Sequence, residues 1–366
     1  MSTRDEDFFS NFFVAHTHQP ILFFSSSGMV YKLKVYKLPQ GTPQARGKAM
    51  VNILPLDEGE NITTVMALPE DESSWGSLFV MFATATGSVR RNRLSDFTDV
   101  RANGKIAMKM DKDDHLVRVR VFEDQDNVFL ATRNGKCIRF PVTDVRVFSG
   151  RTSTGVRGIS LTKGDEVIAM SGLKHVKAEV AVRDDYLRSV NAGRRLSGGD
   201  YTDREEDESR DKELAARLRE TQFVEMADAE EYILTVTADG MGKRTSAYDY
   251  RISKRGGKGI DSIDLKRKKK SLTTVVAIIP VVQTDELVMV SDGGQIIRMP
   301  VDGISFTGRT ARGVTLFRVS DGERVVSVSR IRDVVQVDES CDEPSNRPDD
   351  GSVESTSTGE EVVIKK

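Results

Sequence analysis

The segment LFVMFATATGSVRR, residues 78–91, decides the fold predicted for this chain. An apolar run leads into a polar turn that ends at Gly87, and a second run follows with Arg91 four positions after the glycine. A small polar turn that ends in glycine supplies the positive φ that joins two adjacent strands, and β-branched and aromatic residues favour the strands themselves. The segment therefore predicts a β-hairpin.

The same pattern occurs five times, and the turn glycines lie 59, 48, 105 and 54 residues apart. The copies span residues 21–32 (ILFFSSSGMVYK), 78–91, 128–139 (VFLATRNGKCIR), 232–244 (YILTVTADGMGKR) and 287–298 (LVMVSDGGQIIR). Repeats of roughly 50 residues with about four short strands each predict blades, because one such sheet cannot bury both faces and must stack on its neighbours.

A second element follows each turn glycine after about nineteen residues. It is a glycine, often preceded by a basic residue and followed by an apolar run. Its copies are ARGKAMVNIL from Ala45, ANGKIAMKM from Ala102, GVRGISL from Gly155, RGGKGIDSIDL from Arg255 and ARGVTLF from Ala311. Together, the two elements predict an all-β, propeller-like fold of five visible four-stranded blades over residues 4–333.

The doubled gap between repeats predicts an insertion at residues 172–231. Residues 209–232 favour a helix with a narrow apolar stripe at Leu214 and Leu218. Residues 191–209 are rich in glycine and charge, which is typical of a mobile loop. We expect the insertion to be a solvated appendage and residues 338–366 to form a disordered acidic tail.

The formal net charge of −2 conceals a strong asymmetry along the chain. Residues 201–231 contain twelve Asp or Glu against five Lys or Arg, and residues 337–366 contain nine against three. The rest of the chain therefore has a net charge of +11. Basic repeats with acidic appendages favour a polyanionic partner for the folded part.

Basic residues recur at fixed places in the repeats, and we predict that they bind DNA phosphates around a curved rim. One set lies four positions after the turn glycines: Lys32, Arg91, Arg139, Arg244 and Arg298. The other set surrounds the second element: Arg46, Lys48, Lys105, Arg151, Arg157, Lys254, Arg255, Lys258, Arg309 and Arg312. The alternative is that these cations only protect exposed edge strands from aggregation.

Side-chain direction is left open by the sequence. Strand alternation would place the offset-four residue on the same face as the apolar Val30, Val89 or Ile296, unless the strand bends or ends there. The loop KRGGKG (Lys254–Gly259) could clamp a phosphate through backbone amides and flanking cations, or it could be an ordinary glycine-rich connector.

Enzyme patterns are absent from the sequence. His16 and His18 lack a third metal ligand nearby, and no nucleophile elbow, paired-carboxylate motif or nucleotide fingerprint occurs. Cys137 and Cys341 are far apart and very different in setting, which fits a reducing cytosol. Neither a membrane span nor an export signal is visible, so we expect a soluble cytoplasmic protein.

Several segments closely resemble the C-terminal domain of the bacterial gyrase A subunit. They are residues 5–39, ARGKAMVNILPL (45–56), TGVRGISL (154–161), GKRTSAYDY (242–250) and FTGRTARGVTLFR (306–318). The resemblance covers residues 4–333 apart from the insertion. It implies a β-pinwheel of up to six blades that wraps double-stranded DNA around a basic perimeter, without sequence specificity and without cutting it.

The resemblance also implies partners and cofactors outside the chain. The family's gyrase A catalytic core and gyrase B subunit would use this wrapping for ATP-dependent negative supercoiling, so ATP and Mg²⁺ belong to the holoenzyme and none to this chain. The chain departs from the family in its insertion and in the position of the gyrase box, which would lie upstream of it. Two alternatives stay open: the equivalent domain of topoisomerase IV, and a protein-interaction propeller without DNA affinity.

Overall fold

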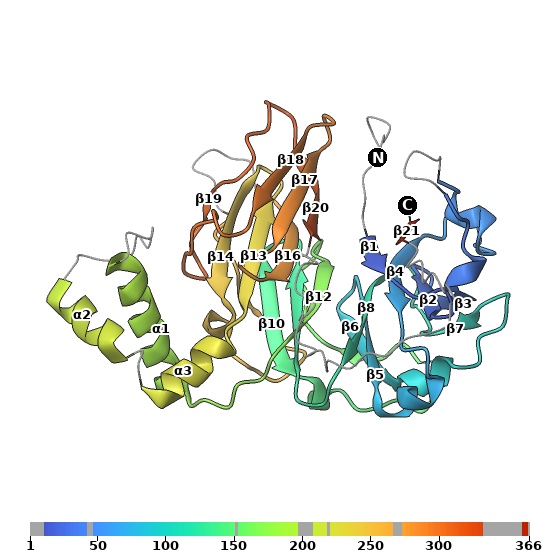
Figure 1. Cartoon of the computed structure of the whole chain (residues 1–366), viewed down its shortest axis with the longest axis horizontal. Coiled ribbons are helices and arrows are strands. Elements are labelled where there is room, and N and C mark those ends of the chain that lie inside the picture. Colours follow the sequence, from blue (N-terminus) through green and yellow to red (C-terminus); the bar gives the residue numbers. More distant parts are fainter. Residues whose placement is uncertain are drawn as a thin grey trace, which may run out of the picture.

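The computed structural model describes residues 11–41, 47–150, 153–196, 208–217, 220–265, 273–331 and 361–364. Five antiparallel sheets follow one another along an arc, in the order of the sequence repeats (Figure 1). Each sheet is a blade and contains one of the predicted hairpins. The all-β, propeller-like prediction is therefore confirmed.

The blades are built from short strands. Blade 1 contains β2 (Pro20–Ser25), β3 (Met29–Lys34), β4 (Ile62–Ala67) and β7 (Lys105–Ile106). Blade 2 contains β5 (Phe79–Thr84), β6 (Ser88–Arg93), β8 (Leu116–Phe122) and β11 (Val156–Arg157). Blade 3 contains β9 (Asn127–Thr132), β10 (Lys136–Pro141), β12 (Val167–Leu173) and β15 (Ile260–Asp261).

The last two blades differ in strand number. Blade 4 contains β13 (Tyr232–Thr237), β14 (Met241–Ser246), β16 (Val275–Val281) and β19 (Val314–Thr315). Blade 5 contains β17 (Glu286–Ser291), β18 (Ile296–Pro300) and β20 (Val325–Ile331). The prediction of four strands in every blade is thus wrong for blade 5 over the residues that the structure describes.

Short 3-10 helices follow the hairpins or join the strands. They are η1 (Val35–Lys37), η2 (Met50–Asn52), η3 (Glu72–Ser77), η4 (Leu94–Phe97), η5 (Val142–Asp144) and η7 (Ala247–Asp249).

Strand exchange joins the repeats. The sheet orders are β4-β2-β3-β7, β8-β5-β6-β11, β12-β9-β10-β15 and β16-β13-β14-β19, so the last strand in each comes from the following repeat. We call β7, β11, β15 and β19 the donated strands. At the opposite edge, β4, β8, β12, β16 and β20 touch one another in succession. The donated strands therefore lie on the outer rim of the arc.

The turn glycines explain why the donated strands dock where they do. All five turn glycines, first among them Gly28, have φ between 76° and 88°, which confirms the predicted hairpins. In blade 1, the amides of Ala107 and Met108 donate to the carbonyl of Gly28 at 2.9 and 3.1 Å. A Cβ at Gly28 would lie 2.3 Å from the carbonyl oxygen of Met108, so only glycine fits.

Apolar side chains fill the space between successive blades. Phe24 of blade 1 packs edge-on against Phe82 and Phe97 of the second repeat, with ring centroids 5.7 and 6.0 Å apart. All three rings are fully buried. Each contributes about 1.5–3 kcal/mol relative to an exposed position, so stacking of blades supplies a large part of the stability.

The insertion contains three helices, α1 (Val180–Leu196), α2 (Glu208–Ala216) and α3 (Thr221–Asp228). Residues 191–196 belong to α1, so the predicted mobile loop is wrong there. One face of the insertion is attached to the repeats, because Tyr186 and Phe223 form a buried cluster with Tyr248 of η7, and the solvated appendage stays a prediction. Leu218 lies outside the described residues.

Both ends of the described chain meet in a small two-stranded sheet. Strand β1 (Asn11–Val14) pairs with β21 (Glu361–Ile364), so the predicted disorder of the tail does not hold for these four residues. The rest of the predicted tail lies outside the described residues. None of the helices in the described parts of the chain is long and apolar enough to cross a membrane.

Substitution of Gly240 by alanine tests the docking of the donated strands. Its Cβ would lie 1.9 Å from the carbonyl oxygen of Phe317, and the glycine has φ of 76°. We expect a loss of about 3 kcal/mol or more in the free energy of unfolding, because the clash adds to the backbone strain. Urea denaturation of the full chain measures it.

Gly322→Ala is the matched control. Gly322 has φ of 89°, but a Cβ at this position would have no atom within 4 Å, so it carries the same strain without the clash. We expect a loss of about 1 kcal/mol. Equal losses for the two variants would contradict the docking role of the turn glycines.

Candidate nucleic-acid interface

Four of the five cations at offset four point into the protein. Arg91, Arg139 and Arg244 expose only 5%, 4% and 3% of their surface, and the side chain of Lys32 exposes 14%. Both faces of β6, β10 and β14 are buried, so three of these cations lie in the interior whichever face they take. A phosphate could not reach three of these groups without opening the blade.

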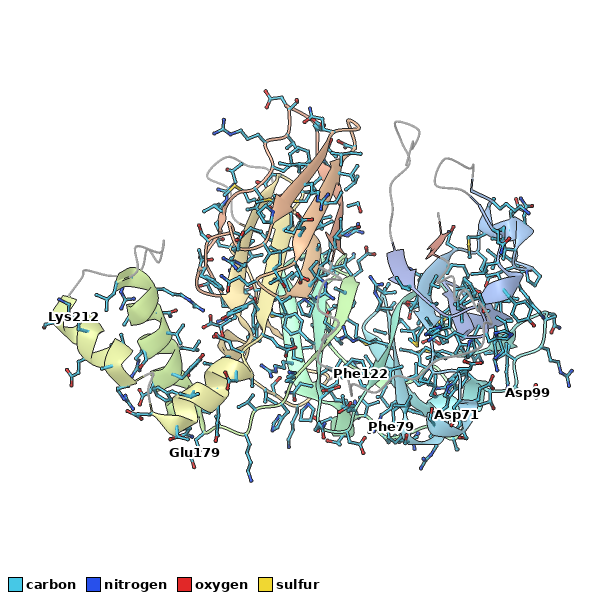
Figure 2. The ribbon with its side chains drawn as sticks, in the orientation of Figure 1. Asp71, Phe79, Asp99, Phe122, Glu179 and Lys212 are labelled. Carbon is cyan, nitrogen blue, oxygen red and sulfur yellow. The ribbon has the colours of Figure 1, made fainter. Side chains whose placement is uncertain are left out.

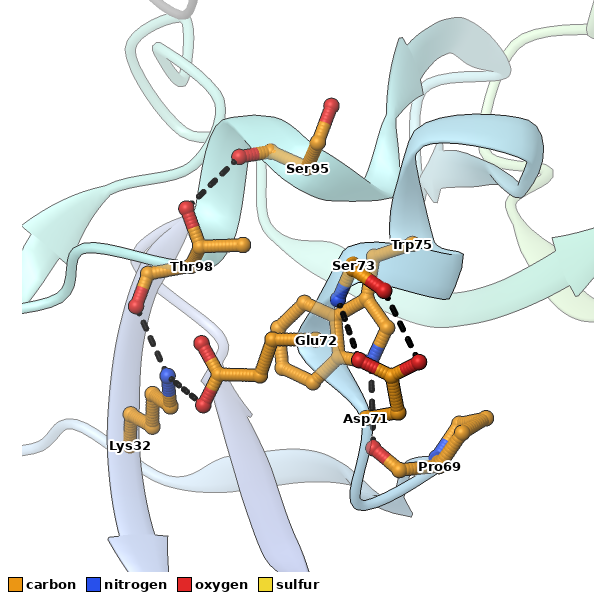
Figure 3. Close-up of polar contacts among 8 residues, drawn as sticks. All are labelled: Lys32, Pro69, Asp71, Glu72, Ser73, Trp75, Ser95 and Thr98. Carbon is orange, nitrogen blue, oxygen red and sulfur yellow. Dashed lines mark hydrogen bonds and ion pairs between the residues drawn. The ribbon is translucent and has the colours of Figure 1, made fainter.

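Lys32 shows the role of the cation four positions after the turn glycine (Figure 3). Its Nζ donates to the carbonyl of Thr98 at 2.7 Å and to Glu72 at 2.6 Å, and it lies 5.1 Å from the centre of the buried Trp75 ring. Thr98 belongs to the following repeat, just after η4. The lysine on blade 1 thus holds the segment that leads to its own donated strand.

Arg139 and Arg244 repeat this arrangement. Arg139 donates to the carbonyl of Ala247 in η7 and to that of Lys174, each at 2.8 Å. Burial lowers the pKa of Arg139 to about 10, so the group remains charged at neutral pH. Arg244 donates to the carbonyls of Asp302 and Ile304 in the fifth repeat, and burial lowers its pKa too.

Arg91 is held from two sides. Its guanidinium pairs with Asp124 and lies 4.0 Å from the ring centre of Phe79, which stands opposite Phe122 at the end of blade 2 (Figure 2). Its backbone carbonyl accepts the amide of Phe148 at 2.8 Å. Arg91 therefore also joins its blade to the next repeat.

Arg298 is the exception that supports this explanation. Its side chain is 65% exposed and pairs with Glu286 across the hairpin of blade 5. Blade 5 has no donated strand among the described residues. Without a following segment to hold, the cation at offset four faces solvent.

These contacts correct the sequence prediction for Lys32, Arg91, Arg139 and Arg244. We assign them to contacts between repeats instead of phosphate binding, because they are largely buried and each donates to a protein oxygen. DNA binding by Arg298 remains a prediction.

Sequence reasoning missed a second layer of buried cations at offset three. Lys243 is fully buried, donates to the carbonyls of Gly308 and Arg309, and has its pKa lowered by burial to about 7. Arg90 is also fully buried and donates to the carbonyl of Ser153 at 2.8 Å. In the sequence, the adjacent basic pairs Arg90-Arg91 and Lys243-Arg244 could have indicated these buried cations.

The cations around the donated strands are arranged differently. Lys48, Arg157, Lys254 and Lys258 are exposed on or beside the second element of their repeats. Three of them accompany β11 and β15 on the outer rim. These four side chains are directed toward solvent, as a surface that contacts DNA phosphates requires.

The remaining predicted cations are partly covered. Lys105 donates to the carbonyls of Asp96 and Asp99 in its own repeat. Arg312 lies 3.3 Å from Asp239, and Arg255 and Arg309 donate to backbone carbonyls. Arg46 and Arg151 lie outside the described residues.

Two carboxylates in the loops before β8 and β12 accept backbone amides of hairpin turns. Asp114 accepts the amide of Thr86 at 3.0 Å, and Asp165 accepts that of Asn134 at 2.9 Å. Both carboxylates hold a hairpin turn from the loop that precedes an inner strand. These two acidic groups therefore stabilise hairpin turns.

The described residues offer no metal-binding cluster. They contain no group of three or more His, Cys, Asp or Glu side chains that could hold a metal ion. Cys137 is buried, and burial raises the pKa of its thiol to about 12. A thiol with so high a pKa is a poor nucleophile at neutral pH.

Comparison with known proteins gives a consistent result. A family model described as the DNA gyrase C-terminal domain, a β-propeller, matches residues 19–69, 79–123, 126–172, 231–272 and 285–332. The DNA gyrase A subunit of Rickettsia bellii is 47% identical over 331 residues, covering 90% of this chain and 36% of that protein. The corresponding protein of Staphylococcus aureus strain MRSA252 is 34% identical over 352 residues, covering 96% of this chain and 33% of that protein.

Solved structures agree on the fold. The C-terminal domain of a DNA topoisomerase IV superposes with a TM-score of 0.65 at 19% identity, covering 86% of this chain and 80% of that one. A DNA gyrase A C-terminal domain superposes with a TM-score of 0.58 at 22% identity, covering 86% of this chain and 83% of that one. The chain spans about a third of the length of the curated relatives that it matches.

Arg139→Met tests the role of the buried cations. The substitution leaves the carbonyls of Ala247 and Lys174 without their donor, so we expect a loss of about 2–4 kcal/mol in the free energy of unfolding. Arg298→Met, at the same offset but exposed, should change it by less than about 0.5 kcal/mol. Chemical denaturation measures both, and a neutral Arg139→Met would contradict the assignment.

Proposed function

Because the chain belongs to the DNA gyrase C-terminal domain family of β-propellers, we propose that it binds duplex DNA without sequence specificity and bends it along the outer rim of its blades. The observation that carries the proposal is the separation of two classes of cation. Buried cations join the repeats, whereas Arg157, Lys254 and Lys258 are exposed beside the donated strands β11 and β15.

The rim has the properties that a bent duplex needs. Phosphate contacts position DNA without reading its sequence, and the exposed cations Arg157, Lys254 and Lys258 come from two neighbouring repeats whose rim loops touch. Smooth bending of a 20–30 base-pair site by 40–90° costs of order 1–6 kcal/mol, which several distributed contacts can offset.

The wider assembly is part of the same proposal. The gyrase A relatives are about three times as long as the part of them that this chain matches. We infer that the chain serves, in the cytoplasm, as a non-catalytic DNA-wrapping part of a type II topoisomerase. A gyrase A catalytic core and a gyrase B subunit would supply DNA cleavage, ATP hydrolysis and Mg²⁺.

Neutralisation of the exposed rim cations tests the proposal. The substitutions are Lys48→Gln, Arg157→Gln, Lys254→Gln and Lys258→Gln in one chain. We expect weaker duplex binding and a plot of log K against log salt that is shallower by about 0.9 for each phosphate that is no longer neutralised. Fluorescence anisotropy with duplexes of unrelated sequence, over a range of salt concentrations, measures both quantities.

A matched control removes four exposed cations from the loops of blade 3 and from the helical insertion. The substitutions are Arg133→Gln, Lys163→Gln, Arg188→Gln and Lys212→Gln. The total charge changes by the same amount, so a change in the salt slope for the rim variant alone identifies the rim. Absence of duplex binding by the unaltered chain at moderate salt would refute the proposal and favour a protein-interaction propeller.

A further inference from the structure

We propose that Arg255 and Arg309 are positioning residues that fix the angle between successive blades, and so the curvature of the DNA track. The inference rests on the proposed function. Each arginine ties the rim loop of its own repeat to the donated strand of the preceding repeat.

The two arginines occupy equivalent positions. Arg255 lies four residues before Gly259, and Arg309 lies four residues before Gly313. Both glycines have positive φ, 70° and 89°, and introduce a donated strand. A Cβ at Gly259 would lie 2.5 Å from the carbonyl oxygen of Cys137, which shows how closely this part of the loop approaches the neighbouring hairpin.

Their acceptors are equivalent as well. Nη1 of Arg255 donates to the carbonyl of Arg157 at 3.0 Å, and Nη1 of Arg309 donates to the carbonyl of Asp261. Arg157 and Asp261 are the second residues of the donated strands β11 and β15. The same contact therefore occurs twice in the same register, once between repeats 3 and 4 and once between repeats 4 and 5.

The loop around Arg255 shows how firm the connection is. Nε of Arg255 donates to the carbonyl of Asp144 at 3.0 Å, the amide of Gly256 donates to that of Gly158 at 2.6 Å, and the amide of Ser160 donates to that of Gly257 at 2.8 Å. The glycines of KRGGKG thus allow two rim loops to hydrogen-bond through their backbones. This use accounts for the motif without a phosphate.

The backbone of Arg309 is held by a buried lysine. The buried Nζ of Lys243 donates to the carbonyls of Gly308 and Arg309, so blade 4 holds the backbone from which the guanidinium reaches β15. The side chain and the backbone of Arg309 therefore connect blades 3 and 4. A shift of either blade would break one of these contacts.

Arginine is suited to this role because its planar guanidinium presents several donors in a fixed geometry, whereas lysine has one flexible ammonium. Replacement by lysine keeps the positive charge and removes the fixed geometry. The affinity for DNA, which depends on charge, and the curvature, which depends on the blade angle, can therefore be separated.

The experiment measures DNA topology with the full chain. A nicked circular plasmid is ligated in the presence of the chain, the protein is removed, and the topoisomers are resolved on a gel. For R255K/R309K we expect unchanged affinity and salt slope, but a linking-number shift per bound chain at least about two-fold smaller than for the unaltered chain. The single variant R255K, expected to give an intermediate shift, replaces the double variant if the latter does not fold.

The control R188K/R217K makes the same chemical change on the helical insertion, where both arginines pair with Asp185. It should leave the shift unaltered. If R255K/R309K matches the unaltered chain in shift, the inference is overturned while the proposed function stands. If the unaltered chain binds DNA without any shift, wrapping itself fails and the inference fails with it; if it binds no DNA, the proposed function fails.

Discussion

The structure depends on the donation of one strand from each repeat to the blade before it. The donated strands are only two residues long, so their own hydrogen bonds cannot hold them in place. The carbonyl of a turn glycine and a buried cation provide the remaining attachment. In blade 4, these are Gly240 and Arg244, which bind the two ends of one segment of the fifth repeat.

This constraint explains how much the sequence could predict. The five hairpins follow from local rules, because a polar turn that ends in glycine specifies its own backbone conformation. Strand exchange does not follow from local rules, since residues 105–106 carry no sign that they pair with residues 29–30 instead of with their own hairpin. For the same reason, the offset-four cations were assigned to DNA: a cation that binds a carbonyl of the next repeat resembles, in sequence, a cation that binds a phosphate.

Part of the insertion was mispredicted for a related reason. Helix α1 packs on Tyr248, just after β14, and on Phe306 of the fifth repeat, both distant from it in sequence. Arg194 lies 4.0 Å from the ring centre of Phe306, on which Arg244 also packs at 4.0 Å. A helix held by an aromatic ring from another repeat cannot be recognised from its own apolar stripe.

The two classes of cation respond differently to salt, and this difference links the fold to the function. Buried cations such as Arg139 are shielded from mobile ions, so the joints between blades persist at salt concentrations that weaken phosphate contacts. In the proposed function, exposed cations such as Lys258 displace counterions from the DNA phosphates, so these contacts weaken as salt rises. The blades can therefore keep one curvature while DNA binds and dissociates, which a wrapping surface requires because the duplex, and not the protein, is the component that bends.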